Sequence, residues 1–360
     1  MIGVTESMTT KRYTSPDPEL DSYYGDLAAK DLQPLWELGE MFTSEPKAAA
    51  VPHRWRAADL YELADRAGKL VPIERGGDRR VIGLANPGLG GAPFIAPSLW
   101  AGVQFLMPGE LAPPHRHTAA ALRFILRGRG AYTVVDGDAI PMTPGDLVLT
   151  PGWTVHEHHN PGDEPMTWLD VLDLPLVIAL EALFFEQRPD DPEQKCPPRS
   201  ASEMLYGQSA GMVPVGNQAP AFDGPSSPLT VYRWTDTDAA LEAQLEATSA
   251  DEATVRFRDP TRARDVMPTL RCEMTRMRAG ATGSTQRQTG SQVVTVLNGS
   301  GRAQLAEHSF DLMEGDIFAV PSWVPWHLSA DTQLDVFVTS DAPVLEALAL
   351  FRRDQAEASR

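Results

Sequence analysis

The chain has 360 residues, with 49 acidic and 31 basic side chains, which gives a formal net charge of −18. This surplus of carboxylates repels phosphate backbones and anionic lipids, so binding to nucleic acids or to membrane surfaces is disfavoured. A content of 42% hydrophobic and 22% charged residues is typical of globular proteins, and the length suits two domains.

The N-terminal part of the chain has helical spacing, and we expect it to carry no targeting or membrane segment. Residues 1–24 contain no apolar run, and no window approaches the roughly 18 apolar residues of a membrane span. Apolar residues recur at helical spacing over 26–42 and over 57–70, which predicts two helices. The two cysteines, Cys196 and Cys272, are too few for a disulfide framework and lack metal-ligand spacing. We therefore expect a cytoplasmic protein with reduced thiols.

Short strands separated by turns dominate the remainder of the chain. Over 77–173, β-branched and aromatic runs alternate with Pro-Gly, Asp-Gly and Asn-Pro pairs, which is typical of a β-sandwich or barrel. Residues 187–228 are rich in Pro, Ser, Gly and Gln without periodicity, 236–247 is helical, and short strands resume over 267–339. The predicted domains are an N-terminal helical arm (1–75), a first barrel (76–186), a linker and helix (187–250), and a second barrel (251–360).

The two strand-rich regions are copies of each other, about 170 residues apart. The first copy contains Gly109-x5-His115-x-His117, and the second contains Gly280-x5-Gln286-x-Gln288. Further on, Gly145-Asp146-x4-Pro151-x-Trp153-x2-His156 matches Gly315-Asp316-x4-Pro321-x-Trp323-x2-Trp326. The second copy therefore keeps the barrel pattern and has lost the three histidines.

The three histidines of the first copy predict a metal site. His115 and His117 lie on one face of a strand, because strand side chains alternate with a period of two, and His156 comes from a later strand of the same barrel. Histidine is the commonest metal ligand, and no cysteine or nearby carboxylate competes for the role. The alternative is that all three are ordinary core or rim histidines.

The motifs together resemble those of a bicupin. The sequence departs from the cupin pattern in two places: Ala121 and Leu122 occupy the position of the usual glutamate, and Trp153 replaces a glycine. The stretches HRHT-x3-LRF, TPGW-x2-H-x-H and WLD-x-LD-P resemble the gentisate 1,2-dioxygenase and salicylate 1,2-dioxygenase family, from about residue 35 to residue 351. The matching cupin positions are Gly109, His115, His117, Gly145, Pro151, His156 and Asn160.

This resemblance implies an all-β-dominated bicupin of two double-stranded β-helix (jelly-roll) barrels, flanked by N-terminal and interdomain helices. It also implies one Fe(II) per chain in the N-terminal barrel, O2 and an aromatic hydroxy acid as substrates, and a homotetramer. Three neutral imidazoles leave the charge of the ferrous ion uncancelled, which favours an anionic chelating substrate such as a 2-hydroxybenzoate. Three protein ligands leave three octahedral positions, two for the substrate and one for O2. The implied reaction opens the ring between the carboxyl- and hydroxyl-bearing carbons, and gentisate would give maleylpyruvate.

The resemblance also implies roles for residues around the metal. Arg123 and Arg79 resemble the arginines that bind the substrate carboxylate, with Arg80 as the alternative to Arg79 and a structural ion pair as the alternative for Arg123. Trp100, Gly102 and Gln104 alternate on one strand and resemble a pocket wall, clearance for the ring and a polar contact.

Two further residues resemble the family's acid–base groups. His158 is on the face of His156 and resembles the histidine that contacts the substrate hydroxyl, whereas His159 is expected to point away. Asp170 resembles the acid that orients His158 or meets the distal hydroxyl, and its alternative role is to cap a turn.

Two other classes of function remain open. Three histidines also hold catalytic zinc, which would make the chain a hydrolytic or hydrating cupin, and a bicupin can bind a ligand without catalysis. Within the leading class, the alternatives to gentisate are salicylate, a 5-substituted salicylate and 1-hydroxy-2-naphthoate. All four acids share one chelating edge, so the metal and the arginines do not distinguish them.

Overall fold

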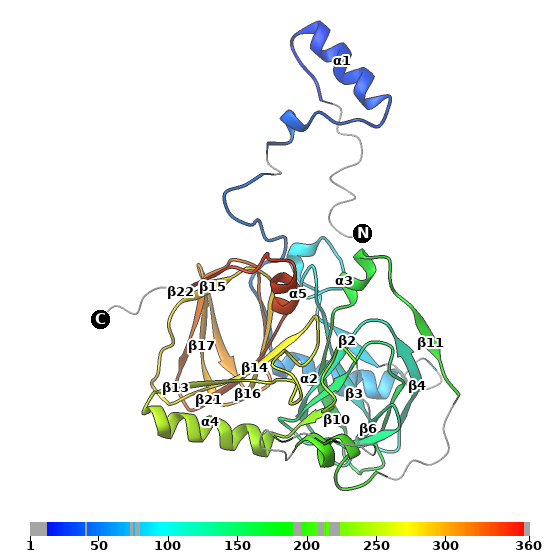
Figure 1. Ribbon diagram of the computed structural model, residues 1–360, viewed down its shortest axis with the longest axis vertical. Coiled ribbons are helices and arrows are strands. Elements are labelled where there is room, and N and C mark those ends of the chain that lie inside the picture. The colour runs from blue at the N-terminus through cyan, green and yellow to red at the C-terminus, as the bar shows by residue number, and fades with distance from the viewer. Residues whose placement is uncertain are drawn as a thin grey trace.

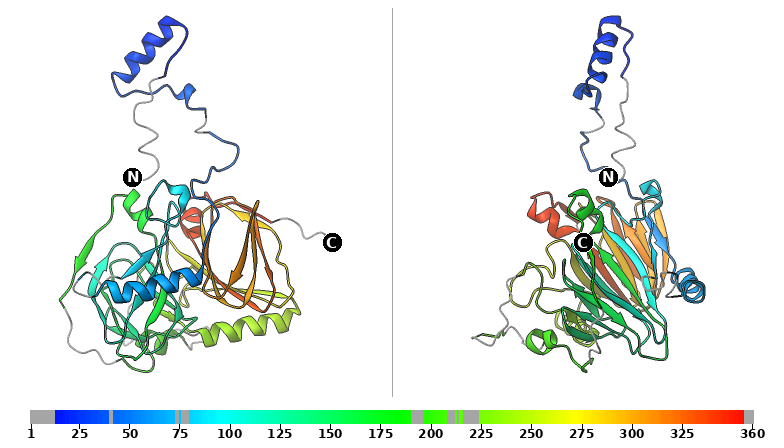
Figure 2. Two further views of the ribbon diagram at one scale, coloured as in Figure 1. Left: turned by 180° about the vertical axis from the view of Figure 1, so that it is seen from behind. Right: turned by 90° about the vertical axis from the view of Figure 1, so that its right-hand side faces the viewer.

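A computed structural model describes residues 13–39, 42–72, 75, 80–189, 196–207, 212, 214–215 and 224–355. Two β-barrels lie side by side, and the N-terminal segment that carries α1 stands away from both of them (Figures 1 and 2). The predicted bicupin architecture is therefore confirmed. None of the helices in the described ranges combines the length and the apolar character that a bilayer span requires.

The first barrel is built from a six-stranded and a five-stranded antiparallel sheet. The larger sheet has the order β12-β8-β5-β10-β3-β2, and the smaller has the order β11-β4-β9-β6-β7. The strands are β2 (Val81–Gly83), β3 (Trp100–Leu106), β4 (Leu111–His117), β5 (Ala121–Arg127), β6 (Tyr132–Val135), β7 (Asp138–Pro141), β8 (Leu147–Thr150), β9 (His156–His159), β10 (Met166–Leu172), β11 (Phe185–Gln187) and β12 (Val231–Tyr232).

The second barrel repeats this arrangement strand for strand, which confirms the repeat seen in the sequence. Its sheets have the orders β1-β19-β16-β21-β14-β13 and β18-β17-β20-β15-β22. The strands are β1 (His53–Trp55), β13 (Glu252–Arg256), β14 (Arg271–Met277), β15 (Gln286–Gln288), β16 (Gln292–Asn298), β17 (Ser300–Leu305), β18 (His308–Met313), β19 (Ile317–Val320), β20 (Trp326–Ala330), β21 (Leu334–Ser340) and β22 (Arg353–Gln355).

The two six-stranded sheets pack against each other and form the core between the barrels. Phe124 of β5 stacks on Phe337 of β21 with ring centroids 4.1 Å apart, and both rings are buried. Leu122 belongs to the same core, so strand alternation turns Arg123 and Ile125 to the opposite face, into the interior of the first barrel. This parity decides which side chains of β3, β5, β8 and β10 reach the candidate site.

Each barrel is completed by a strand that precedes the other barrel in sequence. β1 pairs with β19 of the second barrel, and β12 pairs with β8 of the first. A helix follows each of these strands, α2 (Ala57–Leu70) and α4 (Trp234–Thr248). Asp316 accepts the first amide of α2 at 2.8 Å, and Asp146 accepts that of α4 at 2.9 Å. The exchange ties the two barrels together through backbone hydrogen bonds.

The helices agree with the sequence predictions in two places and differ in one. The predicted helix over 57–70 is confirmed as α2, and that over 236–247 lies within α4. The helix predicted over 26–42 is wrong: α1 spans Pro18–Ala28, and only a 3-10 turn, η1 (Leu35–Glu37), follows. Asp17 caps α1, and after it ends Pro34 supplies no amide hydrogen and restrains the residue before it. The other helical elements among the described residues are η5 (Pro87–Leu89), α3 (Leu174–Ala179), the π-helical turn η6 (Glu203–Gly207) and α5 (Ala342–Ala347).

Trp153 occupies the motif position at which the cupin pattern has glycine. Its φ angle is +68°, in the left-handed region that favours glycine, and its N–H donates to the carbonyl of His117 at 2.7 Å. The guanidinium of Arg116 lies over the indole, 4.2 Å from the ring centre. The second barrel repeats the device with Trp323, whose φ is +66°, and Arg287. The indole–guanidinium contact therefore accompanies the strained backbone in both barrels.

Candidate active site

Three histidines converge inside the first barrel. His115 and His117 come from β4, and His156 comes from β9, directly opposite His115 in the strand register. The ring centroid of His156 is 4.3 Å from that of His115 and 4.9 Å from that of His117. One ligand atom from each of the three lies within 4.8 Å of the others. This is a group that could hold one metal ion.

Backbone carbonyls fix which nitrogen of each ring faces that point. The Nδ1 atoms of His115, His117 and His156 lie 2.9, 2.8 and 3.0 Å from the carbonyl oxygens of Pro113, Ala119 and Thr154. A carbonyl only accepts hydrogen bonds, so each Nδ1 carries the hydrogen and each Nε2 keeps its lone pair for a metal.

The buried imidazole of His156 is chemically ready for a metal. Its Nε2 is buried and has no hydrogen-bond partner within the described part of the chain. Burial, followed by Arg123 and the two neighbouring histidines, holds the pKa of His156 well below its usual value, so the ring is neutral. A neutral imidazole with an unpartnered nitrogen is the form that a transition metal binds, and a group of three histidines fits iron or zinc.

The opposite wall of the site is a buried arginine–aspartate pair. Asp170 of β10 lies directly opposite Arg123 of β5, and the Arg123 Nε is 3.4 Å from Asp170 Oδ1. Arg123 Nη1 also donates to Thr150 Oγ1, and Trp168 Nε1 donates to Asp170 Oδ2 at 3.2 Å. Arg123 is 3% exposed and Asp170 is 4% exposed, so both charges sit inside the barrel.

Burial changes the acidity of this pair. Burial raises the pKa of Asp170 to about 6, against the opposing effects of Arg123 and the Trp168 hydrogen bond. Burial likewise lowers the pKa of Arg123, and Asp170 opposes that shift. After burial, Arg123 is the largest influence that lowers the pKa of His156 and of His158, which indicates that the guanidinium is close to the histidine wall.

His158 lies beside the metal-binding group and is fully enclosed. Its ring centroid is 6.1 Å from that of His156 and 5.3 Å from that of Trp168. Its Nδ1 is buried without a hydrogen-bond partner among the described residues, and burial holds its pKa well below the usual value. Asp170 makes no hydrogen bond to His158: its Oδ2 accepts from Trp168, whose ring packs against His158. His159, on the other face, stacks on Tyr132 at 4.6 Å.

Trp100, Gly102 and Gln104 share the inward face of β3, as alternation predicts. A Cβ added to Gly102 would lie 2.6 Å from the Trp100 indole and 2.7 Å from the Val81 side chain. The room that Gly102 leaves is therefore taken up by Trp100, and the glycine acts first on the position of that indole. Gln104 is buried next to this wall, opposite Trp168 in the register.

Of the two candidate arginines near the N-terminus, one is described. Arg79 lies outside the described residues, so its role stays a prediction. Arg80 pairs with Glu110, donates to the carbonyl of Val71 at 2.8 Å and lies over the ring of Phe105. These contacts engage the Arg80 guanidinium in the barrel wall, which argues against it as a substrate-binding group.

Three contributors to the site escaped the sequence analysis. Trp168 stands two residues before Asp170, so alternation alone would have placed it on the same face. Thr150 ends β8, where its hydroxyl meets Arg123. Phe185 stacks on His115 with centroids 5.6 Å apart, from a strand that pairs with β4 across a long connection. No local sequence pattern predicts the pairing of β11 with β4.

Comparisons with known proteins agree with this geometry. A family model described as a cupin domain matches residues 102–172. The chain is 47% identical to a gentisate 1,2-dioxygenase from Streptomyces sp, over 94% of this chain and 96% of that protein. It is 34% identical to a 5-aminosalicylate 1,2-dioxygenase from Comamonas sp, over 93% of this chain and 90% of that protein. The solved structure of a salicylate 1,2-dioxygenase from Pseudoaminobacter salicylatoxidans in adducts with gentisate matches with a TM-score of 0.91 at 42% identity, covering 98% of both chains.

Proposed function

Because this chain belongs to the gentisate and salicylate 1,2-dioxygenase family of ring-cleaving oxidoreductases, we propose that it opens the ring of gentisate between the carboxyl- and hydroxyl-bearing carbons. The observation that carries the proposal is the pairing of two walls in one barrel: three imidazoles on one side and the buried Arg123–Asp170 pair on the other. The preference for gentisate rests on the relative with 47% identity, which is a gentisate 1,2-dioxygenase.

We propose Fe(II) as the cofactor, one ion per chain, held by the Nε2 atoms of His115, His117 and His156. When bound, ferrous iron supplies the redox chemistry that lets an electron-rich ring react with O2, which zinc does not supply. The unpartnered Nε2 of His156 and the three Nδ1–carbonyl contacts support a metal at this point. We expect the second barrel (251–360) to hold no metal, since Gln286, Gln288 and Trp326 replace the histidines.

The protein's own groups then bind and orient the substrate. Of the three Arg123 nitrogens, Nη1 donates to Thr150 and Nε lies near Asp170. Nη2 makes no hydrogen bond within the described residues. We propose that Nη2 holds the substrate carboxylate, with Arg79 as a second anchor. His158 Nδ1, buried and unpartnered, would meet a ring hydroxyl as a neutral group that can hold or release one proton. Trp100, Gly102 and Gln104 would shape the wall around the ring, and Asp170 would hold Arg123 in place.

Oligomer and location remain proposals of the same kind. We propose a homotetramer, supported by the N-terminal segment that projects from the barrels with large exposed apolar side chains. Leu35 is 56% exposed and Trp36 is 64% exposed. Large apolar side chains exposed in this way are typical of a surface that contacts another chain. We propose a cytoplasmic location, which the two free cysteines support.

The deciding experiment compares substrates on purified, iron-loaded protein. We expect gentisate to consume one O2 per molecule and to give a ring-opened product, with lower kcat/KM for salicylate, 5-aminosalicylate and 1-hydroxy-2-naphthoate. A higher kcat/KM for one of the other acids would replace gentisate as the substrate. O2 uptake with none of the acids would favour the zinc or the non-catalytic alternative, which metal analysis then separates.

A further inference from the structure

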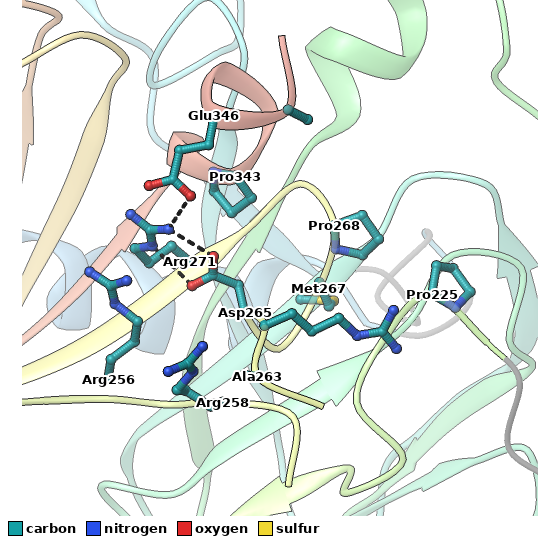
Figure 3. A pocket seen from close by; sticks show the side chains of 12 residues that line it. Pro225, Arg256, Arg258, Ala263, Asp265, Met267, Pro268, Arg271, Pro343 and Glu346 are labelled. Atoms are coloured by element: carbon teal, nitrogen blue, oxygen red, sulfur yellow. Dashed lines mark hydrogen bonds and ion pairs between the residues drawn. The ribbon is translucent and has the colours of Figure 1, made fainter. Parts of the chain in front are cut away.

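An open cavity of about 480 Å³ lies in the C-terminal half, and arginines dominate its lining. It is formed by the loop between β13 and β14, by α5, and by Pro225 from the connection between the barrels (Figure 3). Four arginines and two carboxylates line it, although the whole chain carries a charge of −18. The arginines are Arg256, Arg258, Arg264 and Arg271, and the carboxylates are Asp265 and Glu346.

Carboxylates hold three of these arginines from one side. Arg271 forms a two-pronged ion pair with Asp265, at 2.9 and 2.8 Å, and also bonds Glu346 at 2.7 Å. Arg256 bonds Glu273 through Nε at 2.9 Å, and Arg264 bonds Asp259 through Nε at 2.9 Å. In all three, Nη1 donates to no group within the described residues. Each guanidinium is thus fixed in place while part of its donor edge stays available.

Arg258 is the arginine without a partner. Its carbonyl accepts from Tyr232 at 2.6 Å, and its backbone forms a bridge to Asp265, so the residue itself is anchored. Its exposed guanidinium makes no hydrogen bond or ion pair with any described group. Figure 3 shows it beside Arg256 and Arg271, with no dashed line to a neighbour.

The rest of the lining is apolar and stiff. Pro225, Pro268 and Pro343 contribute rings, and Met267 is a buried side chain. The first barrel has no counterpart: Trp100 stands at the position of Arg271 in β3, and Ile178 stands at that of Glu346 in α3. The cluster is therefore not a by-product of the repeated fold.

We propose that this cavity is a second binding site, for a small carboxylate anion with an apolar body. Arginine donors pair with a carboxylate by charge-assisted hydrogen bonds, and proline and methionine walls favour an apolar body over a bare inorganic anion. The volume suits a small molecule and not a polymer. The site is separate from the first barrel, so the inference does not depend on the proposed ring cleavage.

Isothermal titration calorimetry of the iron-loaded protein tests this site, with benzoate, succinate and inorganic phosphate as probes. We expect benzoate to bind more tightly than phosphate, and Arg258→Ala to weaken that binding by about 10- to 150-fold, since a charge-assisted hydrogen bond is lost. Arg258 has no partner to lose, so the melting temperature of the free variant should stay that of the wild type. Arg278→Ala is the matched control, because Arg278 is exposed beyond the far end of β14.

The outcomes separate this site from the first barrel. Unchanged benzoate binding in Arg258→Ala, together with loss of binding in Arg123→Lys, would place the anion in the first barrel and overturn the proposal. Tighter binding of phosphate than of benzoate would overturn the apolar-body requirement. Absence of binding by all three anions at millimolar concentration would overturn the site itself.

Discussion

The two barrels share one strand order, but the interior of the first is polar and that of the second is apolar. In the first, the inward positions of β5, β9 and β10 carry Arg123, His156, His158 and Asp170, all buried. In the second, the same strand positions carry Val294, Trp326, Leu328 and Val338, which belong to one apolar core. The register is preserved as well, since Arg123 opposes Asp170 where Val294 opposes Val338.

This difference shows what a functional interior requires of a fold. The second barrel buries one polar ring nitrogen at the site of His156, and Gln292 satisfies it at 3.1 Å from Trp326 Nε1. The first barrel leaves His156 Nε2, His158 Nδ1 and Asp170 Oδ1 buried without hydrogen bonds among the described residues. Unsatisfied buried polar atoms cost about 1–3 kcal/mol each, so the grouping of these three inside the barrel, beside the histidine group, marks the place where a metal and a substrate are expected.

The largest expected effect comes from breaking the histidine group. His156→Ala should lower metal affinity by more than about 100-fold and abolish turnover, because two imidazoles hold a labile ferrous ion poorly. Iron content by plasma emission spectrometry and O2 uptake check this. A His156→Ala protein that keeps one iron per chain and normal turnover would contradict the ligand assignment.

The matched change in the second barrel should act on stability and not on the metal. Trp326→Ala removes a large side chain that is 4% exposed, so unfolding should become easier by about 3–5 kcal/mol. Urea denaturation measures the loss, and iron per folded chain should equal that of the wild type. Loss of iron at unchanged stability would show that the second barrel takes part in metal binding.

A smaller effect is expected at the arginine of the polar wall. Arg123→Lys keeps the charge and loses the planar fork, which should lower kcat/KM by about 10- to 150-fold, equivalent to 1.5–3 kcal/mol. Iron content should not change, since no described contact joins Arg123 to the three ligand nitrogens. If iron falls together with kcat/KM, Arg123 supports the metal site and not the substrate.

The Arg123–Asp170 pair predicts a pH dependence of kcat/KM. Burial raises the pKa of Asp170 to about 6, so the carboxylate that faces Arg123 becomes protonated as the pH falls through that value. We expect kcat/KM to drop about tenfold per pH unit below pH 6. Asp170→Asn should have lower activity at pH 8 and lack this limb. A limb at pH 6 that persists in Asp170→Asn would assign it to another group.

The smallest effect is expected from converting one contact to its counterpart in the second barrel. Thr150→Val reproduces Val320 and removes the hydroxyl that accepts from Arg123 Nη1. The loss should be about fivefold in kcat/KM, near 1 kcal/mol, without change in iron content. The reverse change, Val320→Thr, should lower the melting temperature and leave kcat/KM unaltered. Equal kinetics of Thr150→Val and wild type would show that Asp170 alone holds Arg123.

Local patterns predicted the parts of the molecule that depend on local geometry. Strand alternation predicted that His115 and His117 share one face of a strand, the glycine-spaced motifs placed His156 on a later strand of the same barrel, and both revealed the repeat. The helix expected over 26–42 failed because Pro34 breaks a run whose apolar spacing is otherwise helical.

The features that sequence reasoning missed depend on long-range pairing. β1 pairs with the second barrel, which follows it far along the chain, and β12 pairs with the first barrel, which precedes it. Phe185, on β11, stacks on His115 of β4. The contact of Thr150 with Arg123 depends on the register between β5 and β8, which the sequence does not specify. The pattern of residue types along a strand predicts which face each side chain lies on, but it does not predict which other strand pairs with it.

The most direct test of the central claim is a diffraction measurement at the iron absorption edge on crystals of the iron-loaded protein. We predict one anomalous peak per chain, bound by His115, His117 and His156, and none inside the second barrel. A peak held by other side chains, or a second peak among Gln286, Gln288 and Trp326, would contradict it.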